Sequence, residues 1–389
     1  MDYIDQISDA NALIESFRKA AKGSDWKESV QRYEMNLLRN TARLRRQLRS
    51  GEYRQMPFYE FTLCERGKVR PIRSMHISDR VVQRSVCDNA LIPALQPYLI
   101  YDNGASLKDK GVDFARRRLD THLRKFYREH GADGYILLID FSKFFDNVPH
   151  RQLISSLEEK VGDERLMELV RQMIDAFALD VSYMSTDEYE AASTTPINLL
   201  DHYHARQNTA GEKILHKSLG IGAQVSQICG VYYPTPIDNY CKIVRGHRFY
   251  GRYMDDIYII DQDKARLRET LQGIRAIADT LGLYVNPKKT QIVKISHGFT
   301  WLKIRYSLTD TGRVVKRLSR KRITRERRRL KKFRKLCDEG RMPYKDIENA
   351  YRSWRGGAKK YCSRRTIRNM DALFNELFIT DFLHERRKS

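Results

Sequence analysis

The pattern of apolar and polar positions predicts helices and one extended stretch in the first third of the chain. Residues 26–130 have a mainly helical and basic pattern. Within them, Tyr59–Ile72 is rich in strand-forming residues, and its Arg66-Gly67 dipeptide is typical of a turn. We therefore expect one two-stranded hairpin inside a helical region.

Residues 134–310 combine short apolar runs, typical of strands, with helical patterns. From Arg266 to Leu281 the apolar residues fall on one helix face, and Gly282 marks the end of that helix. Residues 185–211 are polar, and we expect an inserted surface loop there. No internal repeat is evident, so the mixture predicts an α+β fold rather than a solenoid.

Acidic residues stand at the ends of two predicted strand regions. The apolar run Tyr135–Ile139 is typical of a strand buried on both faces, and it delivers Asp140 at its exit, before a helix expected from about His150. In Arg248–Asp261, two strand-like runs flank Asp255 and Asp256, which predicts a hairpin with adjacent carboxylates at its tip.

Three clustered carboxylates repel one another unless a cation lies between them. Carboxylates and water are the usual ligands of Mg²⁺. Two such ions, roughly 3.5–4 Å apart, can activate a 3′-hydroxyl and stabilise a leaving pyrophosphate in an in-line displacement. The acids therefore point to nucleotidyl transfer, although an Asp-Asp pair more often forms a solvated hairpin tip than a metal site.

The charge balance points to a polyanionic partner. The chain has 72 Lys and Arg against 49 Asp and Glu, a formal net charge of +23. The excess is concentrated between Arg313 and Lys335, where fourteen basic residues accompany one acid, Glu326. Apolar residues recur there near helical spacing, so part of this stretch is predicted to be a basic amphipathic helix: Leu318, Ile323, Leu330, Phe333 and Leu336. Such a face favours nucleic acid, in a salt-dependent manner, over a solvated face or anionic lipid.

The sequence contains no apolar run of the roughly 20 residues that a bilayer span needs. Its first residues lack the pattern of a secretory signal, and we expect a cytoplasmic protein without a membrane partner. The six cysteines show no metal-binding spacing and are expected to be reduced, buried thiols: Cys64, Cys87, Cys229, Cys241, Cys337 and Cys362.

Together these motifs resemble reverse transcriptases. The segment Phe141-Ser-Lys-Phe-Phe-Asp146, after Asp140, is similar to their first catalytic motif, and Tyr253-Met-Asp-Asp256 is similar to the second. The resemblance covers roughly residues 35–370. It implies a right-hand polymerase fold whose palm is an antiparallel sheet with helices. The parts expected are an N-terminal helical extension (1–34), fingers (35–133), palm (134–310) and a basic helical thumb (311–389).

The resemblance implies roles for the residues of the catalytic motifs. Asp140, Asp255, Asp256 and the backbone carbonyl of Phe141 would hold two Mg²⁺ ions, for which Mn²⁺ can substitute, although Asp256 could instead only shape the field. In Asn286-Pro-Lys-Lys-Thr290, Lys289 is chosen over Lys288 as the group that protonates the pyrophosphate. Phe145 would exclude a ribose 2′-hydroxyl, with a role in the core as the alternative.

Further residues are expected to contact the incoming nucleotide. Lys68 and Arg70, on the hairpin, resemble residues that hold the triphosphate. Ile221, Gly222 and Gln227 lie in a segment that resembles the third motif. Ile221 and Gln227 occupy places where many group II intron and retroviral enzymes have Gln and Pro. This variant resembles the enzymes of diversity-generating retroelements and some related bacterial enzymes, so error-prone synthesis is a hypothesis.

The template and primer are expected to contact residues on both sides of the palm. Arg80 resembles a position near the template. Trp301 lies in a segment that resembles the primer grip, where this chain has Lys303 in place of the family's glycine. In the thumb, Arg328 and Lys331 of the basic stretch and Trp354 of Ser353-Trp354-Arg355-Gly356-Gly357 are the candidates.

The expected function is RNA-directed DNA synthesis from an RNA template, a nucleic-acid primer and dNTPs. One alternative is an anti-phage defence reverse transcriptase that makes repetitive, protein-primed or untemplated DNA. An alternative of another class is a non-catalytic, maturase-like RNA-binding protein, which the intact acids disfavour. A structured non-coding RNA or a small basic accessory protein is an expected partner, and the pattern does not fix the oligomeric state.

Overall fold

The computed structural model describes residues 3–65, 68–197 and 212–378. The chain divides into two units, each assembled from separate stretches of sequence. The first unit comprises Met1–Ala115, Ile139–Ile257 and Arg268–Thr290, and the second comprises Arg116–Leu138, Tyr258–Leu267 and Gln291–Ser389.

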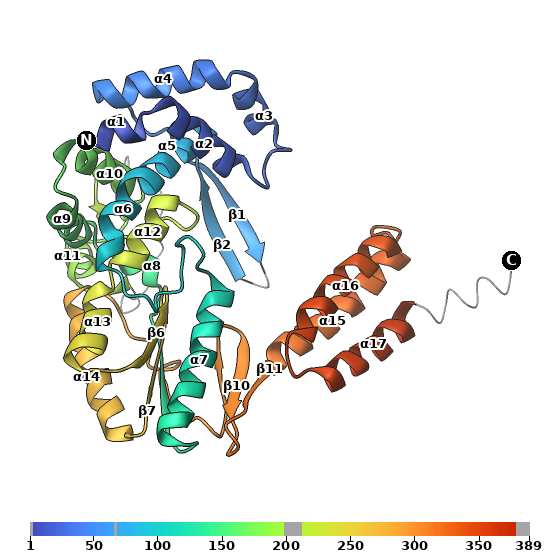
Figure 1. Ribbon diagram of the computed structural model, residues 1–389. Coiled ribbons are helices and arrows are strands. Elements are labelled where there is room, and N and C mark those ends of the chain that lie inside the picture. Colours follow the sequence, from blue (N-terminus) through green and yellow to red (C-terminus); the bar gives the residue numbers. More distant parts are fainter. Residues whose placement is uncertain (1–2, 66–67, 198–211, 379–389) are drawn as a thin grey trace, which may run out of the picture. The chain divides into compact units, whose positions relative to one another are not determined.

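The first unit is mainly helical (Figure 1). Its helices are α1 (Tyr3–Ile7), α2 (Ala10–Ala21), α3 (Glu28–Met35), α4 (Leu37–Ser50), α5 (Ile77–Val86), α6 (Ile92–Leu95), α8 (Phe144–Asn147), α9 (His150–Val161), α10 (Glu164–Asp175), α11 (Thr186–Thr194), α12 (Gln224–Tyr232), α13 (Thr235–Asn239) and most of α14 (Lys264–Thr280). Short π- or 3₁₀-helical turns occupy Cys87–Leu91, Gln96–Tyr98 and Tyr240–Val244.

Two helix boundaries in this unit have clear local causes. Helix α9 ends at Gly162, which takes a left-handed conformation with φ of +64°, as is common just past a helix end. The next residue, Asp163, begins α10 because its carboxylate accepts a hydrogen bond from the Leu166 amide at 2.9 Å. The apolar faces of both helices are buried, and α9 begins at His150, as the pattern there predicts.

Two small antiparallel pairs also belong to the first unit. Strands β1 (Tyr59–Glu65) and β2 (Lys68–Ser74) pair from Tyr59 opposite Ser74 to Glu65 opposite Lys68, which confirms the predicted hairpin. Its expected turn, Arg66-Gly67, lies outside the described residues. Strands β4 (Leu179–Asp180) and β5 (Ile214–Leu215) form the other pair.

Four strands form a sheet in the order β6 (Phe249–Tyr253), β7 (Asp256–Asp261), β3 (Tyr135–Asp140) and β8 (Gln291–Lys294). Strands β3 and β8 are antiparallel. The four middle residues of both β3 and β7 are buried, as expected for apolar runs covered on both faces. The strand predicted before Asp140 is therefore confirmed, as are the two strands that flank Asp255.

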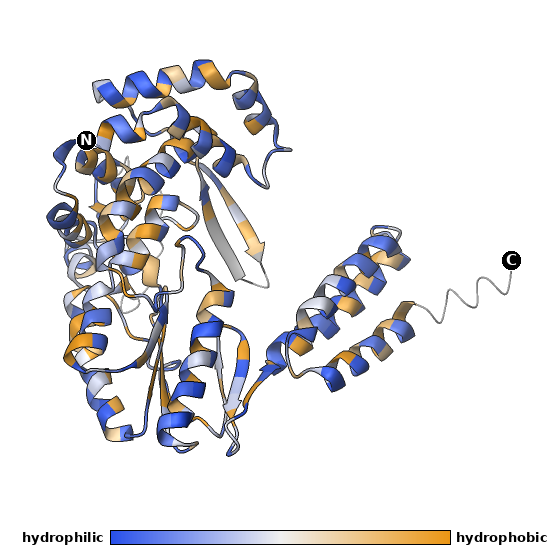
Figure 2. Ribbon diagram, in the orientation of Figure 1, coloured by the Kyte–Doolittle hydropathy of each residue, from blue (hydrophilic) through white to orange (hydrophobic). Residues whose placement is uncertain are grey.

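The second unit contains most of α7 (Val112–His130), a three-stranded antiparallel sheet and three C-terminal helices. The sheet has the order β11 (Val314–Leu318), β10 (Ile304–Leu308) and β9 (Phe299–Trp301). The helices are α15 (Arg320–Asp338), α16 (Tyr344–Lys359) and α17 (Arg364–Phe378). Tyr351 stacks on Phe374 with ring centroids 4.4 Å apart, and Figure 2 shows hydrophobic residues interspersed with hydrophilic ones along these helices.

The helix expected from Arg266 to Leu281 is present as α14, which starts two residues earlier and ends before Gly282, whose φ is +67°. The basic stretch is only partly helical, as expected. However, Leu318 does not belong to the helix face: it lies in β11 opposite Ile304, and Ser319 caps the start of α15.

The expectation of a surface loop over residues 185–211 is wrong for its described part. Ser185 and Glu188 form a capping box that starts α11, a signal that the sequence contained. Buried Lys217 binds the other end of the helix, donating to the carbonyls of Ala192 at 2.8 Å and Thr195 at 3.1 Å. Residues 198–211 lie outside the described residues.

All six cysteines are free thiols, but Cys64 and Cys362 are exposed, so the expectation that every cysteine is buried is wrong. Strand β1 lies in a two-stranded hairpin, which has too few strands to cover Cys64. In the part of the chain that the structure describes, no helix is long and apolar enough to cross a bilayer.

Candidate active site

Asp140 lies at the end of β3, where residues from a distant loop hold both its backbone and its side chain. The amide of Asn286 donates to the Asp140 carbonyl oxygen at 2.8 Å, and Asn286 Nδ2 donates to Oδ2 at 3.3 Å. The ammonium of Lys289 contacts both carboxylate oxygens, at 2.9 and 2.8 Å. Of the two candidate lysines, Lys289 is therefore the one that reaches the acid.

The turn that carries Asp255 is supported by a buried ion pair. Arg252, at the end of β6, is fully buried and donates from Nε to Asp238 Oδ1 at 2.8 Å. It also donates to the carbonyl oxygen of Val231 at 2.8 Å and to that of Met254 at 3.3 Å. Met254 has a φ of +55°, a conformation that residues with a side chain seldom adopt. Arg252 thus helps to hold the turn in this conformation.

The sequence alone gave no sign of this pair. Asp238 is one of many acids, and nothing in its neighbourhood on α13 marks it as the partner of Arg252. Asn286 was part of a recognised motif, but its contact with Asp140 depends on the fold. Both residues act on the candidate site by positioning its acids.

Asp140 and Asp255 are close enough to interact electrostatically. Burial raises the pKa of Asp255, the charge of Asp140 raises it further, and the ammonium of Lys289 opposes the shift. Their strands, β3 and β7, are neighbours in the sheet. The carboxylates of Asp140, Asp255 and Asp256 do not all come within 4.8 Å of one another in the described residues. Even so, this all-oxygen donor set, with one acid disfavoured as an anion, fits a hard divalent cation.

Phe144 and Phe145 have different environments. Phe144 is buried, with 3% of its surface exposed, whereas Phe145 is only partly buried. The two rings meet edge to face, with centroids 5.3 Å apart. A Cβ at Gly230 of α12 would lie 3.0 Å from the Phe145 ring, so glycine there gives the ring its space. Phe144 is thus the core residue, and Phe145 remains the candidate gate.

The candidate third motif forms a tight turn before α12. Ile221 is 56% exposed although it is large and apolar, and Gly222 has a φ of +102°. Gly220 lies against Phe177, and a Cβ there would come 1.8 Å from the ring. Gln227 accepts a hydrogen bond from the Ser106 hydroxyl at 3.4 Å. The turn therefore presents an apolar side chain on its surface.

The backbone of Lys68 and Arg70 lies in β2, opposite Glu65 and Leu63. Their side chains are outside the described part of the structure. Arg80 donates a hydrogen bond to the carbonyl oxygen of Ala20 near the end of α2. Roles in nucleotide or template binding remain predictions for these three residues.

The expected template and primer contacts in the second unit differ in exposure. Arg328 and Lys331 are exposed on α15. Trp354 is buried and stacks on Tyr351, with centroids 5.8 Å apart. Trp301 is also buried, and its ring centroid lies 4.8 Å from that of Tyr258. Both tryptophans thus pack within the protein, and direct contact with nucleic acid stays a prediction for them.

The turn after Trp301 forms without the family's glycine. Trp301 pairs with Ile304, so Leu302 and Lys303 are the two turn residues, and their φ angles are +43° and +69°. Arg116 donates to the carbonyl oxygen of Leu302 at 2.6 Å. The hairpin is closed by two residues in a conformation that normally favours glycine.

The comparison with known proteins decides the family. The model for reverse transcriptase (RNA-dependent DNA polymerase) matches residues 62–306, more than half of the chain. The chain belongs to the reverse transcriptase family. It is therefore an RNA-directed DNA polymerase, a nucleotidyltransferase whose substrates are a nucleic-acid template, a primer and dNTPs. Reverse transcriptases generally use divalent metal ions.

Two curated proteins are similar to this reverse transcriptase. Protein YkfC of Escherichia coli (strain K12) is 25% identical over 280 residues, which cover 67% of this chain and 69% of that protein. The uncharacterized 91 kDa protein in cob intron of Schizosaccharomyces pombe is 24% identical over 210 residues, which cover 45% of this chain and 25% of that protein. The reverse transcriptase thus matches about a quarter of the yeast protein.

Proposed function

We propose that this reverse transcriptase copies RNA into DNA at a site formed by Asp140, Asp255 and Asp256. The supporting observation is the electrostatic coupling of Asp140 to Asp255 beside the Lys289 ammonium. Two Mg²⁺ ions, or Mn²⁺ in their place, would be held by these acids and the Phe141 carbonyl. When bound, they lower the pKa of the primer 3′-hydroxyl and offset charge on the phosphates.

The chain's own residues supply the remaining steps. The Lys289 side chain is 63% exposed and contacts Asp140 through the ammonium at its flexible end, so the ammonium can pass from Asp140 to an oxygen of the triphosphate. There it donates a proton to the departing pyrophosphate. Asn286 keeps Asp140 in place during this exchange because it also bonds the Asp140 backbone.

We propose that the substrate pocket selects deoxynucleotides and checks base pairs loosely. The partly exposed Phe145 ring would exclude a 2′-hydroxyl, and Lys68 and Arg70 would contact the triphosphate. The exposed Ile221 side chain offers no hydrogen bond to the nucleotide, which supports an error-prone enzyme of the kind found in diversity-generating retroelements. A structured RNA or a small basic accessory protein would then present the template.

Primer extension on an RNA template with Mg²⁺ and dNTPs tests the proposed site. We expect the Asp255→Ala, Asp256→Ala double variant to lose activity by at least about 100-fold, since bound metal contributes several kcal/mol to transition-state stabilisation. Asp279→Asn, an exposed acid on α14, is the control and should retain activity. Undiminished incorporation by the double variant would remove these acids from the mechanism.

The biological role needs a second measurement. Sequencing the nucleic acid that co-purifies with the active enzyme should recover DNA copied from a defined RNA template with many substitutions. Recovery of repetitive, protein-linked or untemplated DNA would instead assign the enzyme to anti-phage defence. A protein that retains RNA but makes no DNA would support the non-catalytic alternative.

The proposed low selectivity for correct base pairs leads to a prediction for Ile221. Replacing it by Gln introduces a hydrogen-bonding group at the surface of the turn, and we expect fewer misincorporations per copied template. Sequencing of cDNA from both enzymes measures this, with Ile243→Gln, another exposed isoleucine, as the control. An unchanged error spectrum in Ile221→Gln would refute this account of the motif.

A further inference from the structure

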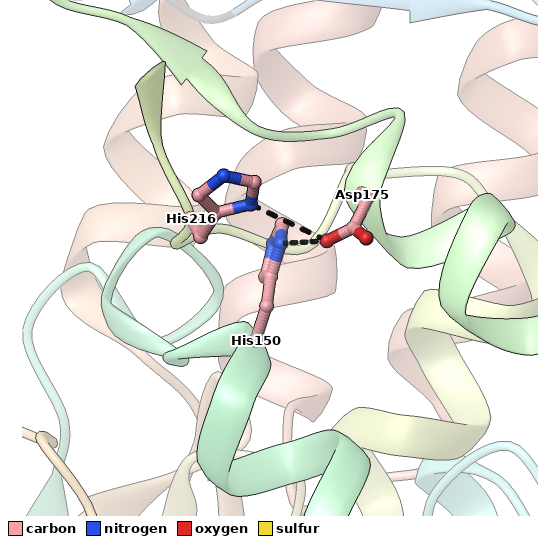
Figure 3. Close-up of side chains that lie close together, drawn as sticks. All are labelled: His150, Asp175 and His216. Carbon is pink, nitrogen blue, oxygen red and sulfur yellow. Dashed lines mark hydrogen bonds and ion pairs between the residues drawn. The ribbon is translucent and has the colours of Figure 1, made fainter. Parts of the chain in front are cut away.

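Three potential metal ligands that belong to no polymerase motif converge in the first unit. Figure 3 shows the rings of His150 and His216 directed toward the carboxylate of Asp175. His150 Nδ1 lies 3.1 Å from Asp175 Oδ1, and His216 Nδ1 lies 3.5 Å from the same oxygen. Among the described residues, this is the group that brings three such ligand atoms within 4.8 Å of one another.

The backbone fixes the three residues in place. His150 is the first residue of α9 and Asp175 is the last residue of α10. His216 follows β5, and its carbonyl oxygen accepts a hydrogen bond from the His150 amide at 2.9 Å. Pro149 and Lys217 form an adjacent antiparallel bridge. The arrangement therefore does not depend on flexible side chains alone.

The hydrogen bonds of His150 determine which ring nitrogen faces Asp175. His150 is buried, with 1% of its surface exposed, and its Nε2 lies 2.6 Å from the carbonyl oxygen of Ser218. Because a carbonyl can only accept, Nε2 must carry a hydrogen. Nδ1 then faces the carboxylate with either a second proton or a lone pair. A lone pair and a carboxylate repel each other at this distance, and a metal ion between them would remove the repulsion.

The distances fit a metal ion. Zinc bonds to imidazole nitrogen and carboxylate oxygen are about 2.0–2.2 Å long, so neighbouring ligands of a tetrahedral ion lie about 3.3 Å apart. The observed separations of 3.1 and 3.5 Å bracket that value. A histidine ligand also commonly donates its second N–H to a backbone carbonyl, as His150 does to Ser218.

We propose that His150, Asp175 and His216 bind one Zn²⁺ ion at a site separate from the polymerase acids. Two nitrogens and one oxygen favour zinc over Mg²⁺, which prefers oxygen ligands. His216 is 61% exposed, so water can reach the fourth position. The ion joins α9, α10 and the strand that leads into the Gly220–Gly222 turn.

The consequence is local stabilisation beside the third motif. The Ser218 amide donates to the Val148 carbonyl at 3.0 Å, and the Leu219 amide donates to that of Phe145 at 2.8 Å. An ion that holds His150 to His216 therefore also stabilises these hydrogen bonds between residues 145–148 and residues 218–219. Its loss should lower the melting temperature of the first unit, even in an enzyme that has lost its catalytic acids.

The test measures zinc rather than DNA synthesis. Metal-free full-length protein is titrated with ZnCl₂ in excess Mg²⁺, which occupies sites made of oxygen ligands, and bound zinc is counted by mass spectrometry. CoCl₂ serves as a spectroscopic probe, because tetrahedral Co²⁺ absorbs visible light strongly. The variants are His216→Ala and Asp175→Asn, and the control is His297→Ala, an exposed histidine of the second unit.

We expect one zinc per chain in the unchanged protein and in His297→Ala, with a tetrahedral cobalt spectrum. His216→Ala should bind at least roughly 100-fold more weakly, since even indirect partners of a metal ligand contribute 10- to 100-fold. Because His216 is exposed, this variant should fold, and circular dichroism verifies it. Added zinc should raise the melting temperature of the unchanged protein but not that of His216→Ala.

Two results would overturn the proposal. One is the absence of stoichiometric zinc in the unchanged protein, which would leave His150 hydrogen-bonded directly to Asp175. The other is equal zinc binding by His216→Ala and the unchanged protein, which would place the metal elsewhere. Neither result bears on polymerase activity, so this proposal can fail while the proposed function stands.

Discussion

Asp255 destabilises the fold at neutral pH because its carboxylate is largely buried beside Asp140. Its pKa in the folded protein is raised above the ordinary value of 3.8. The folded state therefore holds the proton more strongly than the unfolded state. As the pH rises from the unfolded-state pKa of Asp255 through its higher folded-state pKa, the folded state loses stability relative to the unfolded state. This loss persists at neutral pH.

We predict that Asp255→Asn raises the melting temperature at pH 7 in the absence of metal, while it abolishes DNA synthesis. The neutral amide avoids the unfavourable ionisation, so the gain should disappear as the pH falls below about 4, where Asp255 is protonated in both states. Thermal unfolding in the presence of a chelator, at pH 7 and at a pH below about 4, measures this difference in melting temperature. Asp279→Asn should show no such gain, and a lower melting temperature of Asp255→Asn at pH 7 would contradict the account.

Phe145 and Phe144 provide a matched pair of ring substitutions. If the half-buried Phe145 excludes the 2′-hydroxyl, Phe145→Val should reduce the preference for dNTPs over rNTPs by roughly 10- to 100-fold, the discrimination typical of one small group in a pocket. Single-nucleotide incorporation kinetics measures this ratio. Phe144→Val should reduce stability but leave the ratio unchanged, because that ring is in the core. Equal effects of both variants on the ratio would contradict the gate.

At the scale of elements, the β9–β10 hairpin carries backbone strain. Lys303 has a φ of +69°, which is unfavourable by roughly 1–2 kcal/mol for a residue with a Cβ. We predict that Lys303→Gly stabilises the protein by about 1 kcal/mol, since part of the gain is offset by the greater freedom of glycine when unfolded. Urea unfolding measures the change.

Lys303→Ala distinguishes the backbone effect from loss of the lysine side chain. Alanine keeps the Cβ and hence the strain, so this variant should show no comparable gain. If alanine and glycine stabilise the protein equally, the strain at this turn is not the cause.

The elements that the sequence predicted were those with strong local patterns. Strand β3 has a continuous apolar run, α14 has one apolar face and a terminal glycine, and the hairpin at Asp255 has two strand-like runs. Helix α11 was missed because its polar composition outweighed the capping box at Ser185. Leu318 was assigned to a helix because its spacing matched that face, although pairing with Ile304 places it in a strand.

The sequence identifies candidate acids for the site but not how they are held in place. The acids stood out because they end strands. The support for them comes from Asp238 and Asn286, which are distant in sequence, so their contacts arise only from tertiary packing. The two histidines near Asp175 were missed for the same reason: 65 residues lie between positions 150 and 216, and no metal-binding spacing links them.

At the scale of the whole molecule, the net charge of +23 predicts strongly salt-dependent binding of nucleic acid. The distribution of that charge is uneven. Glu326, the one acid between Arg313 and Lys335, is buried and lies 3.5 Å from Arg329. Because Glu326 is buried and paired with Arg329, its carboxylate is not part of the exposed face of the helix. The exposed side of α15 is therefore almost uniformly positive over this stretch.

If α15 contacts phosphates, neutralising Arg328 and Lys331 together should weaken binding of an RNA–DNA hybrid and lessen its salt dependence. Each lost phosphate contact reduces the slope of log K against log salt by about 1, so the double variant Arg328→Gln, Lys331→Gln should lose about 2. Fluorescence anisotropy across a KCl series measures the slope. The control, Lys22→Gln with Lys27→Gln, removes the same charge from exposed positions of the first unit. The slope depends on the number of counterions released from the phosphates that the protein contacts. If only the net charge mattered, both double variants would change the slope equally. If α15 contacts phosphates, only the double variant in α15 should change it.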